Sequence, residues 1–305
     1  MEPIQTTRDA SRWLQGGVWG VAVVAAAWLI KQVLSKPVEL WAEGVWNRIA
    51  HRVRVVRLRD PNDDDVFSAL NLYERRIPAD ERDEAADIVR WLNEVQEETR
   101  SGTSKLEDYF LVARVGSDVA GFAYVQAYHA PGLAFFSYLV VDDTNPKANL
   151  YKLSRELLNT ARKLLSRTNR YRGLVIEVDR PKAGRNKRSK PESDEAAARV
   201  RRFRTLSESV RCPLKELRID YRQPRLSMTS AEKEIPLLLM YAAIDGEKPT
   251  RLKKPEVERI IDFLADDIYG DQFENDEDED RKYRGYLTDW KKELLEKVPE
   301  VVELT

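Results

Sequence analysis

The sequence has very little cysteine and histidine, and this shortage removes several kinds of site. Its 305 residues include one cysteine, Cys212, so no disulfide can form within the chain and a disulfide scaffold is excluded. The two histidines, His51 and His129, lie far apart and lack C-x-x-C or H-E-x-x-H spacing. We therefore expect no zinc site and assign no metal ligand, while a site made of carboxylates alone stays open.

The chain also lacks an excess of charge of either sign. Lysine and arginine number 51 against 52 acidic residues, so no overall field attracts nucleic acid. The basic run RPKAGRNKRSKP at 180–191 has no interleaved aromatic residue for base stacking, and we interpret it as a solvated loop. The acidic run DQFENDEDED at 271–280 lacks calcium-loop spacing and predicts a flexible linker. Nucleic acid is therefore not an expected partner.

Long apolar runs are scarce, and only one is free of charge over a membrane-like length. The run GGVWGVAVVAAAWLI at 16–30, extended to 13–34, gives about 33 Å of helix, enough to cross a hydrocarbon layer of ~30 Å. Tryptophans favour the membrane interface, and five of the seven fall in this region: Trp13, Trp19, Trp28, Trp41 and Trp46. We predict an N-terminal tail at 1–12, a transmembrane helix at 13–34 and an amphipathic juxtamembrane segment at 35–50.

Two other interpretations of this apolar run stay open. It could be a helix buried inside the domain, or a secretory signal peptide with Arg8 and Arg12 as its positive region. Basic residues are more frequent after the run than before it: Lys31, Lys36, Arg48, Arg52, Arg54, Arg57 and Arg59. This asymmetry holds the C-terminal side in the cytosol. We expect a single-pass membrane protein whose main domain is cytoplasmic.

The remaining sequence predicts strands and helices in alternation. Strand patterns cover 51–59, 108–115, 119–128, 134–141, 173–181, 215–225 and 235–244. Helical patterns cover 64–76, 81–98, 146–165 and 194–208. This order predicts an α/β (α+β) fold with a mixed central sheet flanked by helices. Further helical patterns form a C-terminal extension at 247–305, which either covers the sheet or docks another protein.

Several segments in this order resemble the GNAT superfamily of acyl-CoA-dependent N-acyltransferases over roughly residues 51–246. The matching segments are the hairpin GSDVAGFAYV, the strand YLVV before the long helix, the strand end EVDRP, the helix RVRRF and the segment IDYRQPRL. An unrelated α/β domain with the same element order is the alternative. The resemblance implies a GNAT-like acyltransferase domain at 51–246, acetyl-CoA as the acyl donor and an amine as the acceptor.

The resemblance also implies a CoA site at the turn after strand 134–141. Family members bind the pyrophosphate on backbone amides of a Gln/Arg-x-x-Gly-x-Gly/Ala turn, whose defining positions here hold Asn145, Ala148 and Leu150, and none matches. Asp142 and Asp143 would repel a phosphate, and we expect Asn145 to cap a helix that starts at Pro146. The contacts assigned to CoA are Leu139, Val140, Val141, Asn145, Lys147, Ala148 and Asn149.

The catalytic candidates follow from the same resemblance. The family's usual acid is a tyrosine after a phenylalanine in the helix 194–208, where this chain has Arg204 after Phe203. Tyr138, Glu177 and Tyr221 remain as candidates, with Glu177 as the base. In the structural alternative, the tyrosines only pack in the sheet and the glutamate only forms an ion pair.

The sequence thus predicts a membrane-anchored N-acyltransferase that moves an acetyl or other acyl group from CoA to an unidentified amine. The alternative is a GNAT-like domain that has lost catalysis and serves as a membrane-tethered binding or scaffold module. The glycine-free turn and Arg204 favour this second hypothesis.

Overall fold

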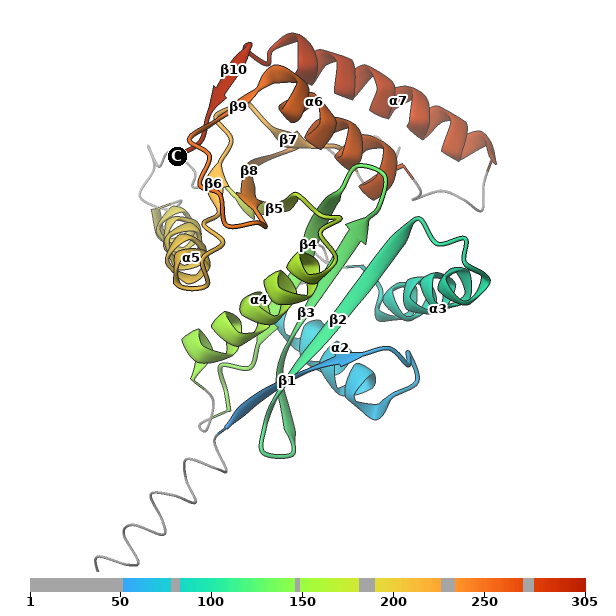
Figure 1. Ribbon diagram of the computed structural model, residues 1–305, viewed down its shortest axis with the longest axis vertical. Coiled ribbons are helices and arrows are strands. Elements are labelled where there is room, and N and C mark those ends of the chain that lie inside the picture. Colours follow the sequence, from blue (N-terminus) through green and yellow to red (C-terminus); the bar gives the residue numbers. More distant parts are fainter. Residues whose placement is uncertain (1–51, 78–82, 146–148, 181–189, 226–233, 271–276) are drawn as a thin grey trace, which may run out of the picture. The chain divides into compact units, whose positions relative to one another are not determined.

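The computed structural model describes residues 52–77, 83–145, 149–180, 190–225, 234–270 and 277–305. Val53–Thr305 form one compact unit, which is the subject of the description that follows (Figure 1). The predicted segments 1–12, 13–34 and 35–50 lie outside the described residues. Among the helices of the described part, none combines the length and the apolar character that a membrane crossing requires.

A mixed sheet of eight strands forms the centre of the unit. The strands lie in the order β1-β2-β3-β4-β5-β8-β6, and β7 also pairs with β8. The β4–β5 pair is parallel, and the other pairs are antiparallel. The bounds are β1 Val53–Leu58, β2 Leu106–Val115, β3 Asp118–Tyr128, β4 Leu133–Val141, β5 Gly173–Asp179, β6 Lys215–Glu216, β7 Arg222–Gln223 and β8 Ile235–Ala243. This arrangement confirms the predicted mixed sheet.

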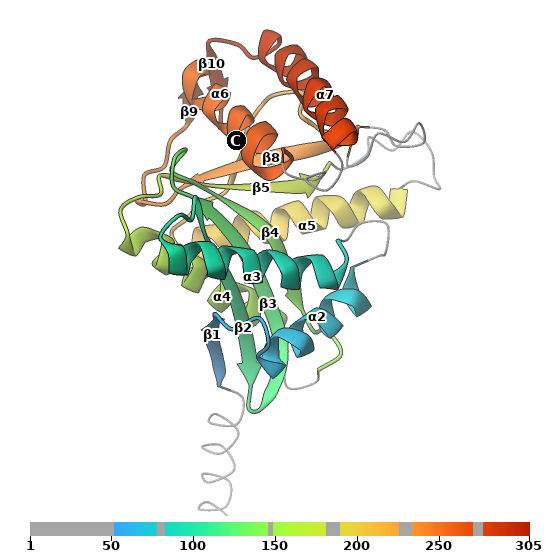
Figure 2. The same cartoon turned by 90° about the vertical axis from the view of Figure 1, so that its right-hand side faces the viewer.

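Helices cover both faces of the sheet, as Figure 2 shows from the side. The helices α4, Leu150–Arg167, and α5, Lys190–Ser209, pack on one face. The helices α2, Asp64–Arg76, and α3, Ala85–Ser101, pack on the other face over β2, β3 and β4. Apolar residues at helical spacing direct one stripe of each helix to the sheet, as the buried Leu153, Leu157 and Ala161 of α4 illustrate.

The C-terminal segment covers the rest of the second face. It comprises α6, Lys254–Phe263, a π-helical turn η1, Leu264–Ile268, and α7, Glu277–Glu296. A two-stranded sheet of β9, Arg251–Lys253, and β10, Val301–Glu303, completes it. Its apolar side chains share one core with β5 and β8, through Val175, Leu237 and Leu239 among others. Of the two roles predicted for this extension, the described residues therefore have the first, covering the sheet.

The alternation of side chains along each strand separates these cores. Leu174 and Ile176 of β5 face α4 and α5, whereas Val175 faces the C-terminal segment. Glu177, two residues after Val175, shares that second face. Two separate groups of helices cover this face: α2 with α3, and the helices of the C-terminal segment. The strands between the two groups carry polar side chains.

Three predicted boundaries are wrong. The single strand predicted over 215–225 is two short strands, β6 and β7, because a tight turn in which Ile219 N donates to Leu217 O at 2.8 Å breaks the ladder. The long helix begins at Leu150 and not at Pro146, because Asn149 is the residue that caps it. The acidic run predicted as a linker over 271–280 is helical from Glu277, the first residue of α7.

The shared core predicts that the C-terminal segment and the sheet unfold together. Ile261 of α6 is fully buried in this core, so Ile261→Ala should lower the free energy of unfolding by ~2–5 kcal/mol and leave one cooperative transition. Val301→Ala, at a side chain that is 45% exposed, is the apolar control and should change it by less than ~1 kcal/mol. Urea denaturation of both variants measures the difference, and two separate transitions in the wild type would contradict a shared core.

Candidate functional site

The parallel strands β4 and β5 pair over only three residues and then part. Their register runs Leu133 with Gly173, Ala134 with Leu174 and Phe135 with Val175, and ends there. Beyond this point, the β5-facing backbone of β4 has no ladder partner in β5 over residues 136–141. Unpaired backbone groups need other partners, so the parting of the two strands, called the notch below, leaves an edge of β4 whose backbone groups suit an extended chain.

Glu177 of β5 lies beside this notch and is bound by two tyrosines. Tyr221 donates its hydroxyl to Oε1 of Glu177, and Tyr269 donates its hydroxyl at 2.7 Å from Oε1 and 2.6 Å from Oε2. Gln223 Nε2 in turn donates to the Tyr269 hydroxyl at 3.3 Å. Tyr221 was predicted at this site, whereas Tyr269 comes from the C-terminal segment just after η1. The carboxylate is therefore held from two parts of the chain that are far apart in sequence.

This environment changes the proton affinity of all three groups. Burial raises the pKa of Glu177 above its ordinary value, although the hydrogen bonds from Tyr221 and Tyr269 oppose the shift. Burial and the nearby Glu177 raise the pKa of both tyrosines well above the ordinary value, so they stay protonated and act as donors. Glu177 is partly exposed as a residue, while both of its carboxylate oxygens are bonded to tyrosine hydroxyls.

Tyr138 lies across the notch from Glu177, on the same face of the sheet. Its hydroxyl donates to Oδ2 of Asp83, the residue that precedes α3 by two positions. Its ring packs edge-on against Tyr73 of α2, with 4.8 Å between ring centroids. Burial raises the pKa of Asp83, opposed by the Tyr138 hydrogen bond. Tyr138 thus belongs, with Glu177 and Tyr221, to a group of polar side chains beside the notch, called the polar strip below, but its hydroxyl bonds to Asp83 and not to Glu177.

A second buried carboxylate, Asp108 of β2, belongs to this strip and was missed as a site residue. Asp108 is only 8% exposed, and its Oδ2 accepts a hydrogen bond from the Tyr124 hydroxyl at 3.1 Å. Burial raises its pKa to about 7, and the bond from Tyr124 opposes the shift. The sequence offered one signal for it, an acid placed at an inward position of a strand that is otherwise apolar.

The start of α4 differs from the predicted cap. The Asn149 side chain accepts a hydrogen bond from Lys152 N at 2.9 Å, and Leu153 N makes the first helical bond to Asn149 O. Asn149 therefore occupies one of the helix amides that a phosphate would use. Asn145 precedes this cap, and the predicted contacts Lys147 and Ala148 lie outside the described residues. Leu139, Val140 and Val141 end β4 on the approach to this turn, paired with β3.

The two aspartates of this turn are paired with an arginine that the sequence analysis missed. Arg76, at the end of α2, contacts Asp142 at 2.9 Å and Asp143 at 2.5 Å. Burial alone would raise the pKa of Asp142. Hydrogen bonds from Thr144 and Arg76 outweigh burial and hold this pKa below its ordinary value. The repulsion expected between this turn and a phosphate is therefore reduced by one compensating charge.

Arg204 occupies the helix position where the resemblance expects a tyrosine. Its guanidinium pairs with Glu216 of β6 at 3.1 Å, while the preceding Phe203 packs against the core under α4 and α5. The Arg204 guanidinium is engaged by Glu216, so this position holds an ion pair where a tyrosine hydroxyl was expected. Of the residues described here, Tyr221 and Tyr269 are the hydroxyls that contact Glu177.

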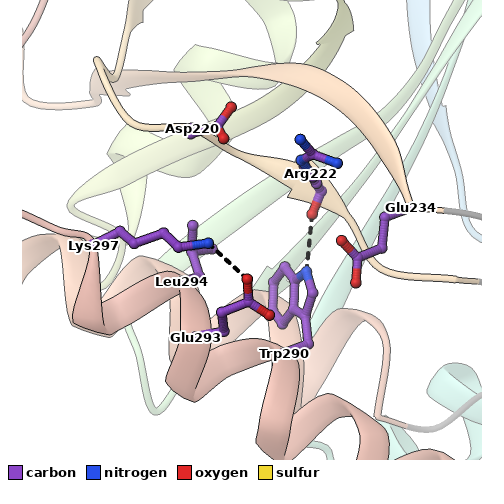
Figure 3. A pocket seen from close by; sticks show the side chains of 7 residues that line it. All are labelled: Asp220, Arg222, Glu234, Trp290, Glu293, Leu294 and Lys297. Carbon is purple, nitrogen blue, oxygen red and sulfur yellow. Dashed lines mark hydrogen bonds and ion pairs between the residues drawn. The ribbon is translucent and has the colours of Figure 1, made fainter.

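A pocket of about 190 Å³ lies between β7 and α7 (Figure 3). Trp290 Nε1 donates to Arg222 O at 3.0 Å, and Lys297 pairs with Glu293 at 2.6 Å. The Trp290 ring is edge-on to Tyr221, with 6.1 Å between centroids, so Tyr221 separates this pocket from Glu177. None of the predicted site residues lines it. Its lining residues are Asp220, Arg222, Glu234, Trp290, Glu293, Leu294 and Lys297.

Comparisons with known proteins find similarity in structure alone. No protein-family model and no curated protein sequence matches the chain. The chain is similar to the acetyltransferase of GNAT family from Streptococcus pneumoniae, with a TM-score of 0.37, 16% identity and coverage of 63% of this chain and 99% of that one.

Two further solved structures show the same level of similarity. The ribosomal-protein-S18-alanine N-acetyltransferase from Escherichia coli has a TM-score of 0.36 at 18% identity, with 63% of this chain and 94% of that one covered. An aminoglycoside 6'-N-acetyltransferase complexed with coenzyme A has a TM-score of 0.41 at 13% identity, with 64% and 99% covered. These scores are low, so the chemistry of the site must be inferred from the residues of this chain.

The raised pKa of Asp108 predicts a specific pH dependence of stability. The unfolded chain releases this proton near the ordinary pKa of 3.8, whereas the folded protein holds it to about 7, so stability falls as the pH rises between these values. The loss is on the order of 4 kcal/mol at most. Asp108→Asn should remove this part of the slope, as measured by urea denaturation from about pH 4 to pH 8.

The exposed Asp118→Asn, at the first residue of β3, is the matched control and should keep the wild-type slope. An unchanged slope in the Asp108 variant would contradict the assignment.

Proposed function

We propose that the chain is an N-acyltransferase that moves an acyl group, most simply acetyl, from CoA to an amine. The observation that carries the proposal is the parting of β4 and β5 next to Glu177. The pantetheine arm of CoA is extended and contains amides, so it can pair with the free edge of β4 as an added strand would. The thioester then lies beside the carboxylate.

The phosphates of CoA are proposed to lie at the start of α4. The helix dipole and the amides of the first turn favour an anion there, and Arg76 offsets part of the charge of Asp142 and Asp143. The proposed contacts are those predicted from the resemblance, at Leu139, Val140, Val141, Asn145, Lys147, Ala148 and Asn149. Because Asn149 occupies the Lys152 amide, we expect weaker phosphate binding than at an open turn.

Glu177 is proposed as the base. The amine nitrogen attacks the thioester carbonyl, its surplus proton passes to Glu177 directly or through water, and the departing CoA thiolate takes up a proton. The raised pKa makes Glu177 a stronger base than an ordinary carboxylate, which suits this step. Tyr221 and Tyr269 hold the carboxylate in place, and Tyr138 faces it across the notch.

A glutamine in place of Glu177 tests the base assignment. Full-length Glu177→Gln should release free thiol from acetyl-CoA ~10²–10⁴-fold more slowly than the wild type with the same amine, because the proton acceptor is lost. Acetyl-CoA at 100 times its dissociation constant should still add ~2.7 kcal/mol to the stability of the variant. Glu208→Gln, at an exposed position near the end of α5, is the control and should leave the rate unchanged.

The second candidate function is a GNAT-like binding or scaffold module without catalysis. Two observations favour it. The Asn149 side chain already binds the Lys152 amide at the start of α4, and Arg204 pairs with Glu216 where the resemblance expects a tyrosine. Stabilisation by acetyl-CoA without thiol release from any amine would select this candidate. Absence of stabilisation by acetyl-CoA would exclude the transferase.

We further propose that residues 13–34 anchor the protein in a membrane as a single span, with the main domain in the cytoplasm. The support is the charge-free run at 16–30 and the basic residues that follow it. A protein partner at the C-terminal helices stays a separate proposal.

Charge placed inside this run tests the anchor. The wild type should stay in the membrane pellet after carbonate extraction, whereas Ala25→Asp with Ala26→Asp should move into the supernatant, because each aspartate costs ~2.5–3.5 kcal/mol near the centre of a span. The apolar pair Ala25→Leu with Ala26→Leu is the control. Extraction of the wild-type protein would refute the span.

A further inference from the structure

Asp108 is a buried carboxylate with one oxygen that no donor reaches. Its Oδ2 accepts from Tyr124 at 3.1 Å, whereas its Oδ1 has no hydrogen-bond partner among the described residues. A buried carboxylate oxygen without a hydrogen-bond donor costs free energy. A ligand that donates a hydrogen bond to this oxygen would remove that cost. The Glu177 reaction does not use this group.

A second carboxylate, Asp83, is linked to Asp108 through two tyrosines. Tyr124 of β3, which contacts Asp108, is directly opposite Tyr138 of β4, and Tyr138 donates to Asp83. Tyr124 also senses the charge of Asp83, which contributes to its raised pKa behind burial and Asp108. The four residues, called the cluster below, lie on the α2–α3 side of the sheet, and the two carboxylates are joined through the tyrosines and not by a direct contact.

Once its acids are ionised, this cluster has negative charge that no cation pairs directly. Within the described ranges, no lysine or arginine forms an ion pair with Asp83 or Asp108. Arg57 donates to the backbone oxygen of Asp108 at 2.5 Å and favours its ionised form, but its guanidinium pairs with Glu107 at 2.8 Å. Burial of the Asp108 carboxylate is costly when no cation pairs with it, and a ligand cation would reduce that cost.

From this geometry we infer that the cluster binds an organic ammonium group through Asp108, with Asp83 and the tyrosine rings around it. A primary ammonium has three N–H donors and one positive charge, which match the free Oδ1 and the missing cation. The faces of Tyr124 and Tyr138 add cation–π attraction. Gln126, which is opposite Asp108, and Ser137 are partly exposed, so the proposed entry for the ammonium group is on their side.

The register of the sheet separates this ammonium from the reacting nitrogen. Asp108 is opposite Gln126, Gln126 is opposite Phe135, and Phe135 is opposite Val175, so the four lie on one line across β2, β3, β4 and β5. Three strand spacings make ~14 Å between the backbones of β2 and β5. Glu177 lies two residues beyond Val175. A nitrogen at Asp108 is therefore not the nitrogen that meets Glu177.

The acceptor implied by both sites carries two amino groups, one held at Asp108 and one presented to Glu177. As an acceptor site, the cluster rests on the proposed acyl transfer, whereas ammonium binding at Asp108 does not. Binding measured without CoA therefore separates a failure of this inference from a failure of the proposed function.

Titration calorimetry of the full-length protein with octane-diamine, octylamine and octanol tests the inference. Both amines should bind and octanol should not, and the diamine should bind more tightly than the monoamine. Asp108→Asn should weaken diamine binding roughly tenfold to a hundredfold and remove its advantage over octylamine, since an ionic hydrogen bond is lost. The exposed Asp118→Asn is the matched control and should bind as the wild type does.

Asp83→Asn, at a partly exposed carboxylate, is a second variant in case the Asp108 variant does not fold. A smaller loss of diamine affinity is expected there, in the same direction. Three outcomes would overturn the inference: no binding of any amine, equal binding of diamine and monoamine, or diamine affinity that survives both substitutions. The affinities of hexane-diamine and decane-diamine then show which chain length fits the spacing of the two sites. Equal affinity for diamines of all three lengths would also contradict two-point binding.

Discussion

Two parallel strands that part inside a sheet leave backbone groups that must find partners elsewhere, and this constraint organises the protein. The β4–β5 ladder ends at Phe135 and Val175. Along the line where it ends, the apolar covers of the second face also stop, with α2 and α3 on one side and the C-terminal segment on the other. Glu177 and the other polar side chains of the strip lie between these two groups of helices. Neither group packs over this line, so apolar side chains would not be buried there.

The C-terminal segment does more than cover this face. It supplies Tyr269, whose hydroxyl contacts both oxygens of Glu177, and Trp290, whose ring supports Tyr221. The proton affinity of Glu177 thus depends on residues that lie outside the 51–246 region of GNAT resemblance. The electrostatics of Glu177 are therefore set in part by the C-terminal segment.

Local patterns predicted the elements well and the site only in part. The helix 64–76 was predicted to the residue because turn-forming residues precede it and one apolar stripe repeats along it, and the structure adds that Asp63 caps it. Glu177 and Tyr138 do share one face, but only because a bulge between Phe136 and Tyr138 shifts the alternation of β4, which the sequence did not reveal. Tyr221 reaches Glu177 from the residue before β7 and not from a strand. The catalytic roles of all three stay predictions. Tyr269, Arg76 and the cap at Asn149 were missed, because their partners are distant in sequence or because the local pattern allowed two helix starts.

The hydrogen bond between Tyr269 and Glu177 joins residues 92 positions apart. Contacts of such separation form late in folding, since a long loop must close before they gain anything. Because the C-terminal segment and the sheet share one core, we expect this contact to form in the step that completes that core. The carboxylate then acquires its surroundings only when both ends of the described fold are in place, so damage to the C-terminal segment would reach Glu177 without touching the sheet.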